Sequence, residues 1–113
     1  MSPITTHVLD LSLGAPARQL HVTLYALEAD GSARELARGI TDHDGRVRDL
    51  LPPASLHLGA YRLTFETGAY FDLAGRTTFY PRVEITFHVR DTSEHHHVPL
   101  LLSPYGYSTY RGS

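Results

Sequence analysis

Residues 82–90 read RVEITFHVR, a stretch in which polar and apolar residues strictly alternate. The apolar positions are Val83, Ile85, Phe87 and Val89. Successive side chains of an extended strand point to opposite faces, so this period of two places all four on one face. An α-helix, with 3.6 residues per turn, would scatter them. The stretch therefore predicts a β-strand with one buried and one solvated face.

The same alternation appears in residues 20–26 and 60–66, which are expected to be strands of the same kind. Asp30-Gly31 marks a hairpin turn, and only residues 67–75 are expected to be helical. About eight short strands at close spacing predict an all-β sandwich of two sheets. The remaining expected strands are residues 5–11, 34–41, 46–49, 95–103 and 107–111.

Length and composition indicate one folded domain over residues 1–113. Hydrophobic residues make up 42% of the chain and charged residues 19%, which is typical of a globular protein and not of a disordered one. A chain of 113 residues can build one packed core but not two. Since no linker, repeat or low-complexity stretch interrupts it, no domain boundary is placed.

Charge and residue usage exclude several classes of function. The formal net charge of −2 provides no broad basic field, so nucleic acid is not an expected partner. The sequence has no cysteine, which excludes disulfides, thiolate catalysis and cysteine-ligated zinc. The longest apolar runs, such as residues 99–102, are too short to span a membrane. No signal peptide is visible in MSPITTHVLD, so a cytoplasmic protein is expected.

Histidines are the candidates for proton transfer, because imidazole titrates near neutral pH. The chain has eight of them, a high count for its length. His21 and His88 fall on the polar faces of their strands, and His43 and His57 fall in loops. These four are expected at the surface, which leaves one histidine near the N-terminus and a run of three.

The run His95-His96-His97 admits two interpretations. A strand places His95 and His97 on one face and His96 on the other. A His-x-His pair on one face is a pattern of metal ligands, and a third ligand could come from His7 or Asp10. Structural histidines with satisfied hydrogen bonds are the alternative, which the spacing alone favours.

The last ten residues, PYGYSTYRGS (104–113), are unusual for a chain end. Three tyrosines and Arg111 crowd into nine positions, whereas chain ends normally carry small or charged solubilising residues. Such an end is expected to be held in place. Composition alone favours a last strand packed in the sandwich, or a contact between subunits, over a part of a reactive site.

Three motifs together point to a known family: TTHVLD (5–10), DGR (44–46) and EHHHVPLLLSPYGYSTYRGS (94–113). With them the chain resembles the transthyretin-related 5-hydroxyisourate hydrolases over residues 5–113. The run that begins HVPLLLSP and ends in YRGS is the most specific of the three motifs.

The resemblance implies a fold, an assembly and a reaction. The fold is a transthyretin-like (prealbumin-like) sandwich of two four-stranded sheets with one short helix. The assembly is a homotetramer, a dimer of dimers, with active sites in the channel where the dimers meet. The reaction is the hydrolysis of 5-hydroxyisourate to 2-oxo-4-hydroxy-4-carboxy-5-ureidoimidazoline in purine (urate) degradation, without a cofactor.

The resemblance also implies that His7, Arg46 and His97 are catalytic. A neutral imidazole would remove a proton from water, with His97 favoured as the base and His7 as its partner or as proton donor to the leaving nitrogen. Arg46 would bind the ureide oxygens and stabilise the developing oxyanion. The family commonly has an aromatic residue where this chain has His96, which should face away from His97. No metal site is expected, although His95 and His97 could bind added zinc or copper.

The terminal tetrapeptide is implied to shape the substrate pocket. Tyr110 would stack on or hydrogen-bond the flat ring, and Arg111 would hold the tail in place. Gly112 would permit a close approach that a side chain would block. Ser113 is the fourth residue implied to be catalytic, and it would help to position water. It would not form a covalent intermediate, because a serine nucleophile needs an adjacent base and an oxyanion hole, and a flexible last residue is poorly held for that.

Two other functions remain open from the sequence. A transthyretin-type protein that binds a small ligand without catalysis would share the fold, so fold alone cannot decide. The second open function is that of a purely structural or partner-binding sandwich. The polar and titratable lining expected from His7, Arg46, His97 and the tail favours catalysis over ligand carriage.

Overall fold

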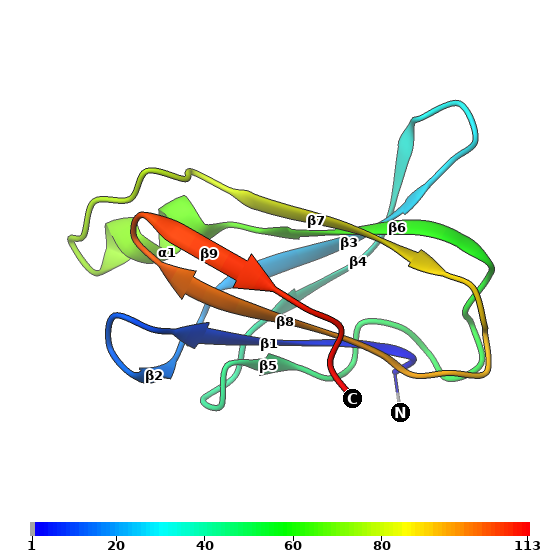
Figure 1. The fold of residues 1–113 in the computed structure, drawn as a ribbon, viewed down its shortest axis with the longest axis horizontal. Coiled ribbons are helices and arrows are strands. Elements are labelled where there is room, and N and C mark those ends of the chain that lie inside the picture. The colour runs from blue at the N-terminus through cyan, green and yellow to red at the C-terminus, as the bar shows by residue number, and fades with distance from the viewer. Residues whose placement is uncertain (1) are drawn as a thin grey trace.

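Two parallel strands from opposite ends of the chain, β1 (Ile4–Asp10) and β8 (His96–Ser103), organise the first sheet. β9 (Gly106–Thr109) pairs antiparallel with β8, and the short strands β2 (Ala15–Pro16) and β5 (Arg46–Val47) pair antiparallel with β1. The structure, a computed structural model, describes residues 2–113. Figure 1 shows β1, β8 and β9 side by side in one layer.

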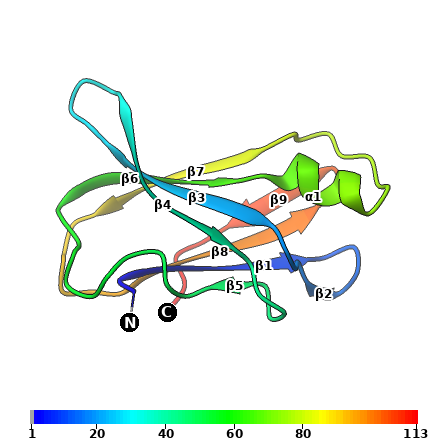
Figure 2. The same ribbon diagram turned by 180° about the vertical axis from the view of Figure 1, so that it is seen from behind.

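The second sheet has four antiparallel strands in the order β4-β3-β6-β7. Helix α1 (Thr67–Leu73) follows this sheet's third strand, and Figure 2 shows it at one end of the two layers. Asp30 and Gly31 lie in the loop of the β3–β4 hairpin, as the sequence predicts. The strands are β3 (His21–Leu27), β4 (Ala33–Ile40), β6 (Gly59–Phe65) and β7 (Val83–Val89).

The alternating residues build the core between the two sheets. In β7, Val83 and Val89 are buried, while Glu84 and His88 are exposed. Burying these apolar faces against each other removes them from water, which is the main force that favours this sandwich. The even-numbered residues of β1 face the core, so its odd-numbered residues face outward. The largest fully buried side chains are Phe65, Phe71, Ile4, Leu20, Leu24, Leu63, Leu100 and Leu102.

The predicted all-β sandwich of two sheets with one short helix is confirmed, with one difference in strand number. The first sheet has five strands and not four, because residues 15–16 form a strand of their own. Gly14 adopts a left-handed φ of 63°, which reverses the chain. The two residues after it then pair with Leu9 and Asp10.

Three elements end earlier than the sequence predicts. β5 covers residues 46–47 and not 46–49, and β9 ends at Thr109 and not at 111. Helix α1 ends at Leu73, because Gly75 takes a left-handed φ of 67° that closes the last turn. After Thr109 the pairing with β8 lapses for two residues, and it resumes in the same register where Gly112 lies opposite His97.

A buried carboxylate ties the first sheet to the segment around helix α1. Asp10 is fully buried and accepts a hydrogen bond of 2.8 Å from the Tyr70 hydroxyl. Ser12 and Arg76 also donate to it. Burial alone would raise the pKa of Asp10, but these hydrogen bonds, led by that of Arg76, outweigh it and lower the pKa. The suggestion that Asp10 could be a metal ligand is therefore wrong, because its oxygens are already engaged.

The four histidines expected at the surface, His21, His43, His57 and His88, are all exposed, as predicted. Among the residues that the structure describes, no helix is both long and apolar enough to cross a bilayer.

Candidate active site

Strand register brings three of the predicted residues together on the outer face of the first sheet. Thr5 and His7 share this face, because both are odd-numbered residues of β1. The parallel pairing of β1 with β8 sets Thr5 opposite His97, and the pairing of β1 with β5 sets His7 opposite Arg46. Residues that lie opposite each other on neighbouring strands project to the same face. His7, Arg46 and His97 therefore form one polar group.

A hollow of about 220 Å³ lies in this face. Arg46, His97 and Ser113, all predicted to be catalytic, meet in its wall, whereas His7 is half-buried beside Arg46 and does not line it. Pockets for drug-sized ligands are typically about 300–1,000 Å³, so this hollow suits a smaller molecule. Its lining consists of Thr5, Thr6, Arg46, Arg48, His95, His97 and Ser113.

The imidazole of His97 is held from two sides. Its Nδ1 lies 2.8 Å from the Thr5 hydroxyl oxygen, within hydrogen-bonding distance. On the other side, a Cβ atom built on Gly112 would lie only 2.5 Å from His97 Cδ2, so this glycine packs directly on the ring. Of the two ring nitrogens, Nε2 is therefore the one that remains free to act on a ligand.

Both predicted catalytic histidines have pKa values below the ordinary 6.5. Burial lowers the pKa of His97, and the positive charge of Arg46 lowers it further, followed by His95 and His7. Burial and then Arg46 lower the pKa of His7 as well. A neutral imidazole is the form that can accept a proton, so near neutral pH both rings are available as bases.

Arg46 keeps its guanidinium available for a ligand. The neighbouring acidic residues, Asp42 and Asp44, pair with Arg48 at 3.2 and 3.8 Å. Asp42 also accepts a hydrogen bond from the backbone amide of Arg46, which fixes the start of β5. Within residues 2–113, no carboxylate lies within ion-pair distance of the Arg46 guanidinium. A planar guanidinium that is not paired with a carboxylate can bind carbonyl or oxyanion oxygens.

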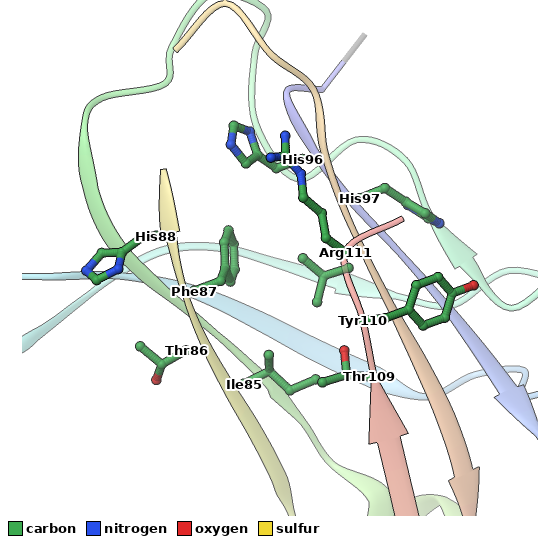
Figure 3. A pocket seen from close by; sticks show the side chains of 10 residues that line it. Ile85, Thr86, Phe87, His88, His96, His97, Thr109, Tyr110 and Arg111 are labelled. Atoms are coloured by element: carbon green, nitrogen blue, oxygen red, sulfur yellow. The ribbon is translucent and has the colours of Figure 1, made fainter. Parts of the chain in front are cut away.

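The tail continues along β8, but its side chains point to two different places. Gly112 forms an isolated antiparallel bridge with His97, and Figures 1 and 2 show the chain end returning toward the start of β1. Figure 3 shows Tyr110 and His97 pointing to one side, whereas Arg111 points the other way, toward His96. Arg111 lies 3.7 Å from the Glu94 carboxylate.

Tyr110 and Arg111 line a second pocket of about 260 Å³, beside β7, and not the hollow (Figure 3). Ser113 thus lines the hollow and Gly112 packs on His97, whereas Tyr110 and Arg111 share the second pocket with His97 and do not line the hollow. Their roles in substrate binding stay predictions.

The histidine run follows the predicted alternation. His96 is 4% exposed and faces away from His97, as expected, and no hydrogen-bond partner for its Nδ1 lies among residues 2–113. His95 and His97 share the outer face, with ring centroids 6.3 Å apart. Their facing nitrogens, however, both approach the hydroxyl of Thr5.

Sequence reasoning missed three residues that line the hollow: Thr5, Thr6 and Arg48. Alternation along residues 5–11 would have placed Thr5 on the same face as His7. No signal in the sequence placed Arg48 near His97, because that proximity depends on how β5 pairs with β1.

Comparison with known sequences gives one consistent family. A model described as the HIUase/Transthyretin family matches residues 4–112. A "5-hydroxyisourate hydrolase 2" of Rhizobium meliloti is 50% identical over 116 residues, covering 97% of this chain and 95% of the relative. The mouse "5-hydroxyisourate hydrolase" is 46% identical over 113 residues, covering 99% of this chain and 96% of the relative.

Solved structures with the same fold include both hydrolases and transthyretins. The 5-hydroxyisourate hydrolase of Klebsiella pneumoniae is 41% identical with a TM-score of 0.84, covering 97% of this chain and 98% of that one. Sea bream transthyretin in complex with thyroxine is 31% identical with a TM-score of 0.93, covering 98% of this chain and 95% of that one. Backbone similarity therefore does not separate the two activities, whereas sequence identity is higher with the hydrolases.

Proposed function

The chain belongs to the HIUase/transthyretin family, and from that premise we propose that it hydrolyses 5-hydroxyisourate. The observation that carries this proposal is the hollow in which Arg46 and the half-buried imidazole of His97 face the same space. Both groups suit the opening of a flat, polar ureide ring. A carrier of apolar ligands would be expected to have a less polar and less titratable lining.

In the proposed reaction, His97 Nε2 removes a proton from water while the water oxygen attacks a ring carbonyl carbon. Negative charge builds on the carbonyl oxygen, where the Arg46 guanidinium stabilises it. The ring C–N bond then breaks, and the leaving nitrogen takes a proton from His7 or from protonated His97. One water is consumed, and the product is 2-oxo-4-hydroxy-4-carboxy-5-ureidoimidazoline. General-base catalysis of this kind typically contributes about 10²–10⁴-fold.

The tail has a supporting part in this proposal. Ser113 lines the hollow and Gly112 packs on the His97 ring beside it, and Ser113 positions water without forming a covalent intermediate. Tyr110 and Arg111 bind substrate or hold the tail. The proposed assembly is a homotetramer, a dimer of dimers, in the cytoplasm, acting without metal or cofactor in urate degradation.

Freshly prepared 5-hydroxyisourate provides the test. The compound also decays spontaneously, so its rate of loss with purified protein is compared with a protein-free control. Faster decay that scales with protein concentration is expected. Decay equal to that of the control would contradict the proposed function.

The alternative function is ligand carriage of the transthyretin type, favoured by the TM-score of 0.93 to sea bream transthyretin. Calorimetric titration with thyroxine separates the two. A carrier would bind thyroxine and leave 5-hydroxyisourate unchanged, whereas the proposed hydrolase shows the opposite result.

A further inference from the structure

We propose that Thr5 couples His97 to His95, so that the three side chains form a relay that fixes the tautomer of His97 and carries its proton outward. The proposal deepens the hydrolase function proposed above and rests on it. Thr5 Oγ1 lies 2.8 Å from His97 Nδ1 and 2.9 Å from His95 Nε2. Thr5 is buried, with 7% of its surface exposed, and these two imidazoles are the hydrogen-bond partners of its hydroxyl.

The valence of a hydroxyl determines how the two hydrogen bonds are arranged. Threonine has one hydroxyl proton to donate, so it donates to one imidazole and accepts from the other. If His97 acts as a base through Nε2, its neutral ring carries the proton on Nδ1. His97 Nδ1–H then donates to Thr5 Oγ1, and Thr5 O–H donates to His95 Nε2. This order leaves His97 Nε2 with a lone pair directed away from Thr5.

The same chain provides an exit for the proton that His97 gains. When Nε2 takes a proton from water, the proton on Nδ1 can pass to Thr5 Oγ1 while the threonine proton passes to His95 Nε2. No bond other than these O–H and N–H bonds changes, and the positive charge moves from His97 to His95. When the leaving nitrogen takes the proton on His97 Nε2, the same transfers run in reverse and restore the Nδ1–H tautomer of His97. His95 is exposed, whereas His97 is half-buried, so water stabilises the charge better at the end of the relay.

The charges around the two rings favour this direction of transfer. His97 faces Arg46 on β5 and His7 on β1, and the positive charge of Arg46 opposes a second positive charge beside it. Near His95 the charged groups are the exposed Glu94, which precedes it in the chain, and Arg111. The Arg111 guanidinium lies 3.5 Å from the His95 carbonyl oxygen and 3.7 Å from the Glu94 carboxylate, and His96 points to the opposite side. Thr5 and His95 are thus positioning residues, since neither is required to touch the reacting atoms.

Substitutions of Thr5 separate a relay from a buried polar contact. Thr5→Ser keeps the hydroxyl and is expected to keep the wild-type kcat. Thr5→Val keeps the shape and removes the hydroxyl, and is expected to lower kcat at least about tenfold with little change in KM. Equal activity of Thr5→Val and the wild type would overturn the proposal, as would equal losses in both variants.

Replacement of the exposed His95 tests the exit without altering the core. His95→Gln can still hydrogen-bond Thr5 but cannot take a proton. Its kcat is expected to fall and to recover when free imidazole is added, because a small mobile base can replace the lost acceptor. A kcat that is unchanged, or that imidazole fails to restore, would count against the exit path.

Nitrogen-15 NMR of the histidine rings tests the tautomer independently of any activity. In the folded protein above pH 7, His97 is expected with its proton on Nδ1, and Thr5→Val is expected to mix the two tautomers. A proton found on Nε2 of wild-type His97 would overturn the proposal even if the protein is an active hydrolase. Failure to accelerate the decay of 5-hydroxyisourate would instead refute the proposed function.

Discussion

The backbone amide of Gly112 donates a hydrogen bond of 2.8 Å to the carbonyl oxygen of His97. The same glycine packs against the imidazole, where a Cβ atom would lie 2.5 Å from Cδ2. The tail therefore sets the position of both the backbone and the ring of the proposed base. Any residue larger than glycine at this position must displace one of them.

Gly112→Ala is expected to lower kcat by about tenfold or more, because the added methyl group pushes the His97 ring out of line with its substrate. Steady-state assays with 5-hydroxyisourate measure the loss. Gly106→Ala is the matched control, since a Cβ there would have an ordinary contact of 3.7 Å with Ser103 Oγ. Equal activity of the two variants would show that Gly112 does not constrain the ring.

His97→Asn is expected to reduce the enzymatic rate at least about tenfold while leaving the fold intact, because asparagine cannot accept the proton from water. The decay of 5-hydroxyisourate and the circular dichroism spectrum are measured together. His21→Asn, an exposed histidine on the other sheet, is expected to behave as the wild type. Full activity of His97→Asn would mean that another group is the base.

Arg46→Gln is expected to raise the barrier by about 3 kcal/mol, since it removes the cation that stabilises the oxyanion. It also removes a positive charge that lowers the pKa values of His7 and His97. Those pKa values should rise, and the acid limb of the rate profile should move to higher pH. Arg38→Gln, an exposed residue of β4, is the control. An acid limb that does not move would show that the charge of Arg46 does not lower the pKa of the titrating histidine.

The wild-type rate is expected to fall on acidification, when the proposed base becomes protonated, and this fall should lie below pH 6.5 because burial and then Arg46 lower the pKa of His97. Folding stability should follow the same direction. Because burial lowers the pKa values of His7 and His97 in the folded state, the unfolded chain binds more protons below pH 6.5. The contribution of these two histidines to the free energy of unfolding is therefore fully present above pH 6.5. It is lost as the pH falls through their pKa values in the folded state. Urea titrations at several pH values measure this, and stability that rises from pH 7 to 5.5 would contradict it.

Asp10→Ala is expected to lower the free energy of unfolding by about 3–5 kcal/mol, because it leaves the partly buried Arg76 and the Tyr70 hydroxyl without their acceptor. Urea denaturation gives the value. Asp49→Ala, at an exposed position, is expected to leave stability unchanged. A loss no greater than that of Asp49→Ala would show that the buried carboxylate is not structural.

The strands were predictable because their residues alternate so regularly. Residues 20–26, 60–66 and 82–90 each lie within one residue of an observed strand. Strand β2 was not predictable, since two residues carry no period and its pairing depends on the left-handed turn at Gly14. Likewise, no local pattern shows that the pairing with β8 lapses after Thr109 and resumes only at Gly112, opposite His97.

The candidate site was predictable in its residue types and not in its connections. The resemblance indicated His7, Arg46 and His97, and alternation put His95 and His97 on one face. The hydrogen bonds from both histidines to Thr5 require the register of β1 against β8, which is a property of the whole fold. The contact of Arg111 with Glu94 was not predictable either, because it depends on the path that the tail takes in the whole fold.

The parallel pairing of β1 with β8 joins Thr5 to a residue 92 positions later in the chain. Such a contact closes a long loop, and the chain loses conformational entropy in closing it before the paired strands stabilise the fold. Proteins rich in distant contacts therefore fold slowly. A nascent chain on the ribosome therefore cannot be active until its last strands emerge. Activity should return in a single late kinetic phase of refolding, without a partly active intermediate.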